Sequence, residues 1–318
     1  MPLSSAENAQ LQQLVWSGSI ALEIRLAAAD CRSFEDSNPY LIHFPRQSYL
    51  GLLLTRLHTF FAASLIDTAA AAHDAWLDFE GVPLKWHYPL GLLYDLYSGS
   101  EPAVSDESHV ESKHDVAHMK LPWKLTVHYS DFPGDQLIQL DEDSRVLLDA
   151  YINNVKEADF IRNGTARAVM SLSKDDSDSL WRAVQLHDMT LFNSINDKLL
   201  NPPGTSIKHT PLKVYLPTSA TATEPIQEEA AGESTPKAGH FKVVQALVPL
   251  RSTGGTPQTV GTALNSILPE LFPSRRNPLL AQPVLHGAIV PMSAVMDDLA
   301  HACAYLDGFV HLTIVMLG

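Results

Sequence analysis

Two cysteines and a group of histidines are the side chains of this sequence that could do chemistry by themselves. Cys31 and Cys303 could each act as a nucleophile, although a free cysteine is far more often a small buried apolar residue. Two cysteines alone cannot make a disulfide scaffold or a zinc site. His114 and His118 are four residues apart, which would place two imidazoles on one face of a helix, and His109 lies nearby. Because that stretch is acidic and has no helical apolar stripe, we expect a solvated insertion and no metal site.

The sequence carries none of the motifs that mark the common enzyme classes. It has no Gly-x-Ser-x-Gly nucleophile elbow, phosphate-binding loop, dinucleotide fingerprint or His-Glu-x-x-His pair. Gly254-Gly255 stands between a predicted strand and a predicted helix with no lysine after it, so we expect a tight turn there. We therefore predict a protein without an active site and without a cofactor. A cysteine enzyme that acts through Cys31 or Cys303 is kept as an alternative.

Composition and charge indicate a folded protein of two or three domains that does not bind nucleic acid. Of the 318 residues, 45% are hydrophobic and 18% are charged, which supplies enough apolar side chains to build cores. The net charge is −14, whereas nucleic acids require clustered Lys and Arg. Half of this charge lies in two low-complexity segments, 99–118 and 217–240. No apolar run could span a bilayer and no secretory signal is recognisable, so we expect a cytoplasmic protein.

Apolar patterns predict two similar sets of elements with helices between them. Ile20, Leu22, Ile24 and Leu26 alternate with polar or small residues, as in a half-buried strand. The other strands of the first set are predicted at 40–44, 76–79, 84–88 and 125–129, and its helices at 50–65 and 90–97. Two helices are predicted next, at 146–160 and 180–200. The second set has strands at 212–216, 241–250, 284–290 and 310–316, and helices at 264–271 and 292–305.

This order predicts an α+β fold in which two ubiquitin-like β-grasp domains flank a small helix-rich domain. The predicted boundaries are an N-terminal helix at 1–15, a first ubiquitin-like domain at 16–136 with an insertion at 98–120, a helix-rich domain at 141–202, and a second ubiquitin-like domain at 207–318 with an insertion at 217–240. Because the sequence ends in Gly318, a ubiquitin-like donor is a second alternative. Donors need a flexible tail, whereas the predicted last strand runs to Met316, which argues against that function.

Five segments of the sequence are similar to the autophagy protein 5 family. In chain order they read PYLIHFPRQSYLGLLL, GVPLKWHYPLGLLYDL, LPWKLTVHYSDFP, VKEADFIRNG and HGAIVP. The similarity runs from Trp16 to the end of the sequence, and its second and third segments are highly specific. The two acidic insertions and Gly51 depart from the family pattern.

The resemblance implies a non-catalytic scaffold that acts in autophagosome formation. In this family, a lysine of the helical domain is linked covalently to the C-terminal glycine of the ubiquitin-like autophagy protein 12, which E1-like and E2-like enzymes have activated. The conjugate binds the N-terminal helix of autophagy protein 16. The complex then acts like an E3 ligase and promotes transfer of autophagy protein 8 to phosphatidylethanolamine at the preautophagosomal or isolation membrane, which it contacts peripherally. A protein-binding adaptor without conjugation is a further alternative.

The same match implies a role for three residues. Lys156 would be the conjugation acceptor, and Arg46 and Tyr49 would line the groove for autophagy protein 16, although both would equally suit a strand end packed on a helix. A lysine amine attacks a thioester only after it has lost its proton. Because Glu157 and Asp159 would stabilise the charged form of Lys156, we expect the E2-like enzyme to supply desolvation or a base.

Overall fold

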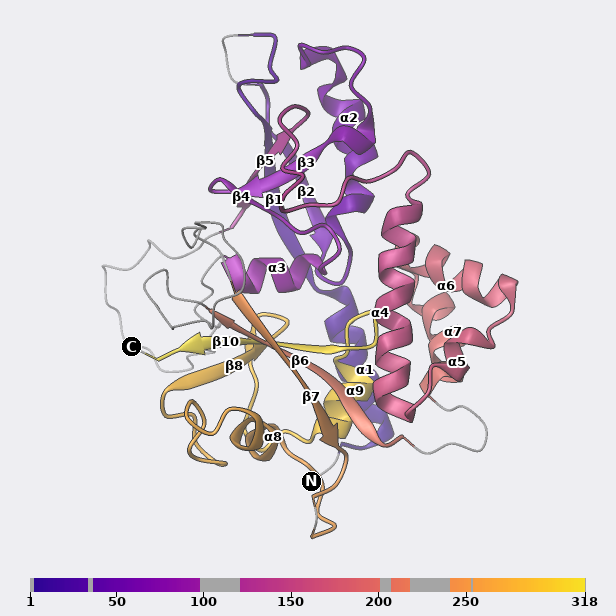
Figure 1. Ribbon diagram of the computed structural model, residues 1–318, viewed down its shortest axis with the longest axis vertical. Coiled ribbons are helices and arrows are strands. Elements are labelled where there is room, and N and C mark those ends of the chain that lie inside the picture. Colours follow the sequence, from indigo (N-terminus) through magenta and orange to yellow (C-terminus); the bar gives the residue numbers. More distant parts are fainter. Residues whose placement is uncertain are drawn as a thin grey trace, which may run out of the picture.

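The computed structural model describes residues 3–33, 37–97, 121–200, 207–217, 241–252 and 254–317. Three parts follow one another in Figure 1: a sheet with its helices at the top, a group of helices at the right, and a second sheet with its helices below. The predicted insertion at 98–120, with His109, His114 and His118, lies outside the described residues. Gly318 and all but the first residue of the predicted insertion at 217–240 also lie outside them.

The chain begins with helix α1 (Ser5–Ser17), which a capping box starts. The Ser4 hydroxyl accepts a hydrogen bond from the Glu7 N–H, and the Glu7 carboxylate accepts one from the Ser4 N–H, so two otherwise unpaired helix donors are satisfied. Trp16 is the only buried residue of α1. Its ring stacks on His187 with centroids 4.6 Å apart, and its Nε1 donates to the His187 carbonyl at 3.2 Å. Trp16, together with hydrogen bonds between the side chains of Gln12 and Asn193, therefore anchors α1 to the helical part.

The first sheet has five strands in the order β2-β1-β5-β3-β4. Its central strands, β1 (Ser19–Leu26) and β5 (Trp123–His128), run parallel, and every other neighbouring pair is antiparallel. The alternation predicted for β1 is confirmed, because Ile20, Leu22, Ile24 and Leu26 are all buried. The other elements are β2 (Tyr40–Pro45), β3 (Trp76–Phe79), β4 (Val82–Pro83), α2 (Leu54–Phe61), α3 (Leu90–Tyr97) and 3-10 helices at Leu50–Leu53, Ala62–Ser64 and Ala72–Asp74.

The strand predicted at 84–88 is wrong. The structure has only the two-residue strand β4 just before this range. It follows a turn where Glu80 and Gly81 have positive φ, 50° and 81°. Beyond β4 the chain turns into the core, where Trp86 is buried and its Nε1 donates to the carbonyl of Ile138 at 2.7 Å. Two residues further on, the partly buried Tyr88 packs against both cores and meets Tyr215 of the second sheet edge-on.

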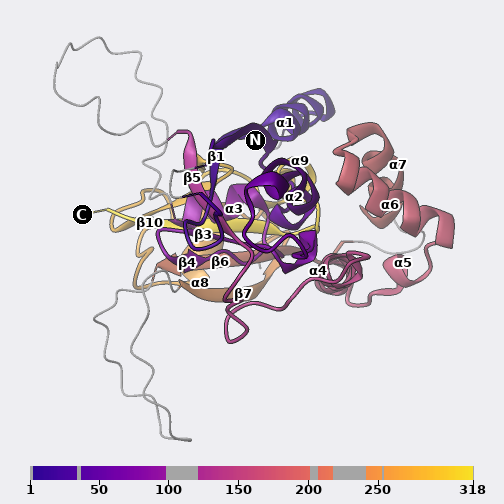
Figure 2. The same cartoon turned by 90° about the horizontal axis from the view of Figure 1, so that it is seen from above.

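Four helices form the middle part: α4 (Arg145–Asn163), α5 (Arg167–Met170), α6 (Lys174–Leu186) and α7 (Met189–Leu200). Helix α4 ends at Gly164, whose φ of 76° suits a residue without a Cβ atom. The single helix predicted at 180–200 is two helices, because His187 adopts a left-handed conformation with φ 53° and ends α6. Figure 2 shows α6 and α7 side by side, away from both sheets.

The second sheet repeats the arrangement of the first, with the order β7-β6-β10-β8-β9 and a central parallel pair. Its strands are β6 (His209–Pro217), β7 (Phe241–Pro249), β8 (Ala281–Leu285), β9 (Ala288–Ile289) and β10 (Val310–Met316), and its helices are α8 (Val260–Ile267) and α9 (Met296–Ala302). The strand predicted at 284–290 is a tight hairpin instead, because His286 and Gly287 have φ of 52° and 80°. The helix predicted at 292–305 is shorter than expected and corresponds to α9.

Helix α3 joins the two sheets. It belongs to the first domain by sequence, yet its Leu92 lies in the same buried cluster as the core residues of the second sheet. The predicted fold class is confirmed: two sheets with the β-grasp strand order flank a small group of helices.

Candidate functional site

Lys156 lies in the middle of α4, and its side chain is half-buried. Within the described residues, no hydrogen bond or ion pair holds its ammonium group. Phe160, one turn further along the same helix, has 59% of its surface exposed. The lysine is therefore partly exposed in the middle of α4, one turn from an exposed aromatic ring that could make an apolar contact.

The two acidic neighbours of Lys156 make their hydrogen bonds elsewhere. The Glu157 carboxylate accepts from Lys213 Nζ at 2.9 Å and from Gln245 Nε2 at 3.2 Å, which ties α4 to β6 and β7. Asp159 is buried and accepts from Asn163 Nδ2 at 2.7 Å. Neither carboxylate forms an ion pair with Lys156; both accept hydrogen bonds from other residues of the fold.

Arg46, just after β2, links three segments of the chain. Its backbone N–H donates to the carbonyl of Gly18, and its carbonyl accepts from the N–H of Gly91 at 2.6 Å. Its guanidinium forms an ion pair with Asp95 of α3; Asp95 is buried, and the Arg46 side chain is 13% exposed. The second oxygen of Asp95 accepts from the N–H of Gly287, in the β8–β9 turn, at 2.9 Å. Burial raises the pKa of the Asp95 carboxyl, and Arg46 and the Gly287 N–H partly offset this rise.

Arg46 packs closely against two glycines. A Cβ atom on Gly91 would lie 3.0 Å from the Arg46 carbonyl oxygen, and one on Gly287 would lie 3.3 Å from the guanidinium nitrogens. Gly287 also has the positive φ that the turn requires. The contact between the two domains thus depends on an ion pair packed between two glycines.

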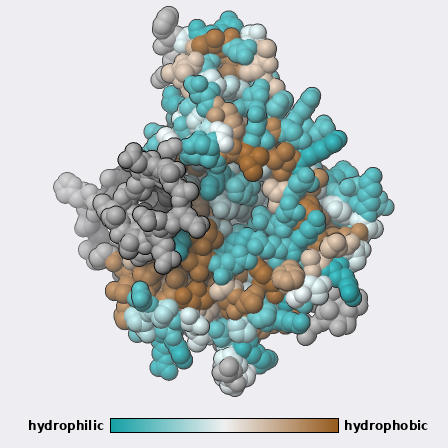
Figure 3. Space-filling model, viewed as in Figure 1, coloured by the Kyte–Doolittle hydropathy of each residue, from teal (hydrophilic) through white to brown (hydrophobic). Residues whose placement is uncertain are grey.

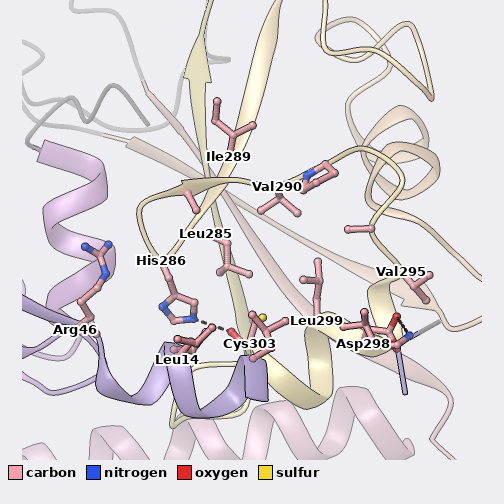
Figure 4. Close-up of a pocket in the computed structure, with 17 residues that line it drawn as sticks. Leu14, Arg46, Leu285, His286, Ile289, Val290, Val295, Asp298, Leu299 and Cys303 are labelled. Atoms are coloured by element: carbon pink, nitrogen blue, oxygen red, sulfur yellow. Dashed lines mark hydrogen bonds between the residues drawn. The ribbon is translucent and has the colours of Figure 1, made fainter. Parts of the chain in front are cut away.

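An apolar groove with a volume of about 460 Å³ opens beside Arg46. Leu11, Leu14 and Val15 of α1 form one wall, and the β8–β9 hairpin and α9 form the others. Figure 4 shows Arg46 at one end of the groove and Asp298 toward the other, with leucine and valine side chains between them. The groove therefore offers an apolar floor with opposite charges at its two ends.

Tyr49 does not line this groove. Its exposed fraction is 1%, and its ring packs edge-on against Tyr151 of α4 with centroids 6.1 Å apart. A direct contact between Tyr49 and a docked helix, as expected from the sequence, does not fit this burial. The tyrosine holds α4 against the first domain, whereas Arg46 does reach the groove.

Both cysteines are buried. Cys303 lines the groove, and burial raises the pKa of its thiol to about 12, so the thiolate needed for nucleophilic attack is scarce at neutral pH. Among the described residues, no group of three His, Cys, Asp or Glu side chains could hold a metal ion. No helix in the described part of the chain is both long and apolar enough to cross a membrane.

A buried chain of polar residues in the second domain could not be recognised from the sequence. His311 Nε2 lies 2.9 Å from Asp307 Oδ2, and the Tyr215 hydroxyl lies 2.8 Å from His311 Nδ1. The order of these groups resembles a catalytic relay. All three side chains are buried, however, so no substrate can reach them, and their hydrogen bonds stabilise the core.

Two β-grasp domains joined through helices, with an apolar groove at their junction, define a multidomain scaffold of the ubiquitin-like fold. Three family models match in order: "Autophagy protein ATG5, UblA domain" at residues 15–129, the "alpha-helical bundle region" of the same protein at 144–202, and its "UblB domain" at 209–314. The chain belongs to the autophagy protein 5 family and has a role in autophagy.

Individual relatives agree with this assignment. Autophagy protein 5 of Phaeosphaeria nodorum is 51% identical over 99% of this chain and all of its own length. The Aspergillus fumigatus protein of the same name is 47% identical over 97% of this chain and 95% of its own. The crystal structure of Kluyveromyces marxianus Atg5 matches the fold with a TM-score of 0.70 at 21% identity, over 96% of this chain and 99% of that chain.

Proposed function

We propose that this chain is the acceptor and scaffold of a ubiquitin-like conjugation, with Lys156 as the acceptor. The modifier is autophagy protein 12, joined by its C-terminal glycine. The observation that carries the proposal is the position of Lys156: it is partly exposed in the middle of α4, unpaired within the described residues, and one turn from the exposed ring of Phe160. An acceptor amine needs this freedom, because it must enter the active site of another enzyme.

The chemistry requires a neutral amine. Lys156 Nζ attacks the carbonyl carbon of the thioester that joins the modifier to the E2-like enzyme; a C–N bond forms, the C–S bond breaks, and the cysteine leaves as a thiolate. A free lysine has a pKa of about 10.4, so its proton must pass to a base before attack. Glu157 is occupied by Lys213 and Gln245, and Asp159 is buried, so this base comes from the E2-like enzyme.

The groove beside Arg46 is the proposed site for the N-terminal helix of autophagy protein 16. An amphipathic helix binds such a groove through apolar residues spaced three and four apart. Leu11, Leu14 and Val15 offer the apolar wall, and Asp298 at the far end favours a basic residue of the partner. Arg46 favours an acidic one, whereas Tyr49 is buried against Tyr151 of α4.

The assembled complex would act like an E3 ligase and direct autophagy protein 8 to phosphatidylethanolamine, with no catalytic group of this chain involved. We place the protein in the cytoplasm, recruited peripherally to the isolation membrane, and keep 16–136, 141–202 and 207–318 as its domains. The ubiquitin-like donor is the weaker function, because β10 extends to Met316 and the Leu317 N–H donates to the Leu280 carbonyl. An adaptor that is never conjugated is the other alternative.

Replacing Lys156 with arginine tests the proposal. Lys156→Arg keeps the charge and most of the aliphatic stem, but its guanidinium stays protonated and cannot attack. In a mixture of modifier, E1-like enzyme, E2-like enzyme and ATP, we expect no reductant-resistant heavier band on a denaturing gel. Lys198→Arg is the matched control, because Lys198 lies on α7 in an ion pair with Asp176. A heavier band from the Lys156 variant would assign the acceptor to another lysine, and no band from the wild type would favour the adaptor.

A further inference from the structure

A small polar cavity lies where the three parts of the chain meet. Its volume is about 20 Å³, which is room for a water molecule or an ion of similar size. Helix α1 contributes Gln12 and Trp16, the segment after β2 contributes Gln47, and α4 contributes Arg162. Helices α7 and α9 and the loop between α9 and β10 complete the wall. Within the part of the chain that the structure describes, no Asp or Glu lines this cavity.

Arg162 is the unusual residue of the polar cavity. Figure 3 shows hydrophilic residues over much of the surface in view, which is where charged side chains normally lie. Arg162 is only 4% exposed, and its one side-chain hydrogen bond within the described residues runs from Nη2 to the Gly308 carbonyl at 3.2 Å. Burial lowers the pKa of its guanidinium, and the charge of Asp159 only partly offsets this. Because a guanidinium carries several N–H donors, most of them still need an acceptor.

No carboxylate among the described residues forms an ion pair with Arg162. Asp159 accepts instead from Asn163 Nδ2 at 2.7 Å and from the Val169 N–H at 3.0 Å. No nitrogen of Arg162 belongs to the fully enclosed side-chain atoms that lack a hydrogen bond, so its unused donors reach open space, which the cavity provides. A buried charge without a counter-charge destabilises the folded state. The cavity therefore presents a positive charge that the described protein leaves unpaired.

Two further side chains with N–H donors line the same cavity. On α9, His301 directs Nδ1 to the carbonyl and the carboxylate of Asp297, at 2.9 Å and 3.3 Å, and its Nε2 has no partner in the described structure. The hydrogen bond with Asp297 raises the pKa of His301, while burial and the charge of Arg162 oppose this rise. Gln47 is 3% exposed, and no described residue accepts a hydrogen bond from its side-chain amide. A guanidinium, an imidazole and an amide thus share one cavity.

We propose that the polar cavity binds a small anion of the size of chloride, held by Arg162 with His301 and Gln47 as further donors. An anion would offset the buried charge of Arg162, whereas a water molecule is neutral and would not. Charged donors suit an anion, because charge-assisted hydrogen bonds are roughly twice as strong as neutral ones. The small volume favours a monatomic ion over phosphate or sulfate.

A bound ion would join all three parts of the chain and fix the position of α1. Gln12 and Trp16 of this helix line the cavity, whereas Leu11, Leu14 and Val15 line the groove on another face of the same helix. The ion would therefore hold one wall of the groove from the face that a docked helix does not use. The inference rests on neither conjugation nor docking, so the unconjugated chain alone tests it.

Thermal melting in two sodium salts tests for the site. The full chain is melted at constant ionic strength while gluconate, which is too bulky for the cavity, is replaced stepwise by chloride. We expect the melting temperature to rise by about 2 °C when chloride reaches about ten times its dissociation constant, because the ion binds only the folded chain. Arg162→Gln removes the charge and should abolish this rise. Arg145→Gln is the matched control and should respond like the wild type, because Arg145 lies on the same helix with 76% of its side chain exposed.

Broadening of the chloride NMR signal is a second readout, and it does not depend on stability. The wild-type chain should broaden the signal, Arg162→Gln should not, and His301→Leu, a change at a half-buried side chain, should broaden it less. If Arg162→Gln does not fold, His301→Leu decides the question. Equal melting of the wild type in both salts without broadening would overturn the inference and assign the cavity to water. An undiminished chloride response in the folded cavity variants would overturn it as well and place the anion elsewhere.

Discussion

Arg46 and Asp95 are the pair of residues on which the junction between the domains most depends. Removing one partner of a buried ion pair leaves an uncompensated charge, which costs about 3–5 kcal/mol. Here the loss also frees the Gly287 N–H, the contact that Asp95 makes with the second domain. The pair therefore sets both the stability of the junction and the shape of the groove end.

Asp95→Ala is expected to lower the free energy of unfolding by about 3–5 kcal/mol, measured by urea denaturation. The control is Asp143→Ala, which breaks the exposed pair with Arg145, where side-chain exposures are 65% and 76%. Exposed pairs contribute about 0–1 kcal/mol, so this variant should unfold like the wild type. Equal losses in the free energy of unfolding would show that burial of the pair between Arg46 and Asp95 does not add to stability.

His286 makes the stability of the protein depend on pH. Burial lowers the pKa of His286 from 6.5 to about 3, and its Nδ1 is buried without a partner in the described structure. Below pH 6.5 the unfolded chain takes up a proton that the folded chain refuses, so stability falls as pH falls toward 3. From this residue alone, we expect the free energy of unfolding to be about 2 kcal/mol lower at pH 5 than at pH 7.

Comparing His286→Asn with the wild type isolates this effect. Asparagine tolerates the left-handed conformation and is favoured before glycine in such a turn, so the hairpin should form. The difference between melting curves at pH 5 and pH 7 should shrink in the variant. His87, whose pKa burial lowers to about 4, remains in both proteins and cancels in the comparison. An unchanged difference would remove His286 as the source.

At the scale of elements, α1 forms one wall of the groove. Trp16 anchors its C-terminal end, and near its N-terminal end the Leu3 N–H donates to Asp298 Oδ2 at 3.0 Å. Leu14 points into the groove yet has 61% of its surface exposed. A charged side chain at this position would weaken binding of an apolar helix in the groove, and it would not disturb a buried core.

Leu14→Glu is therefore expected to reduce capture of the autophagy protein 16 helical peptide at least about tenfold, while melting temperature and conjugation stay normal. A pull-down beside a conjugation gel measures both. Arg46→Glu should also weaken capture, but it would place two carboxylates together in the buried junction and lower stability as well. Peptide binding that survives Leu14→Glu would move the docking site away from this groove.

Most strands and helix α3 could be predicted from the sequence, whereas the two-residue strands beside tight turns could not. The pattern of β1 is local, because one face is buried and the other is not. Leu84, Trp86 and Tyr88 alternate in the same way, but Trp86 enters its own domain and Tyr88 contacts the other. The same limit applies to the site residues. Lys156 could be identified by resemblance, but the partners of Arg46 could not, because they lie far away in the sequence: Asp95 is 49 residues away and Gly287 lies beyond the helical part.

At the scale of the whole molecule, we expect the fold to tolerate removal of the predicted loop after β6. Pro217 and Phe241 are paired neighbours on β6 and β7, so their ends already meet. Deleting 219–238 leaves three residues to connect them, a usual length for a hairpin loop. Each halving of loop length changes the closure free energy by only about 0.6 kcal/mol, in favour of folding. We expect soluble protein with an equal or slightly higher melting temperature; a large fall would show that the segment packs on the fold.

Because Leu92 packs in the core of the second domain, helix α3 is incompletely covered while the protein is being synthesised. During synthesis, α3 leaves the ribosome well before β6 begins at His209. At about 5–20 residues per second, its apolar face waits for roughly ten seconds without the surface that will cover it. A nascent chain halted near residue 136 should therefore be held by ribosome-associated chaperones through α3, and Leu92→Ser should weaken that crosslink. The helix that unites the finished domains therefore exposes Leu92 to solvent for that interval.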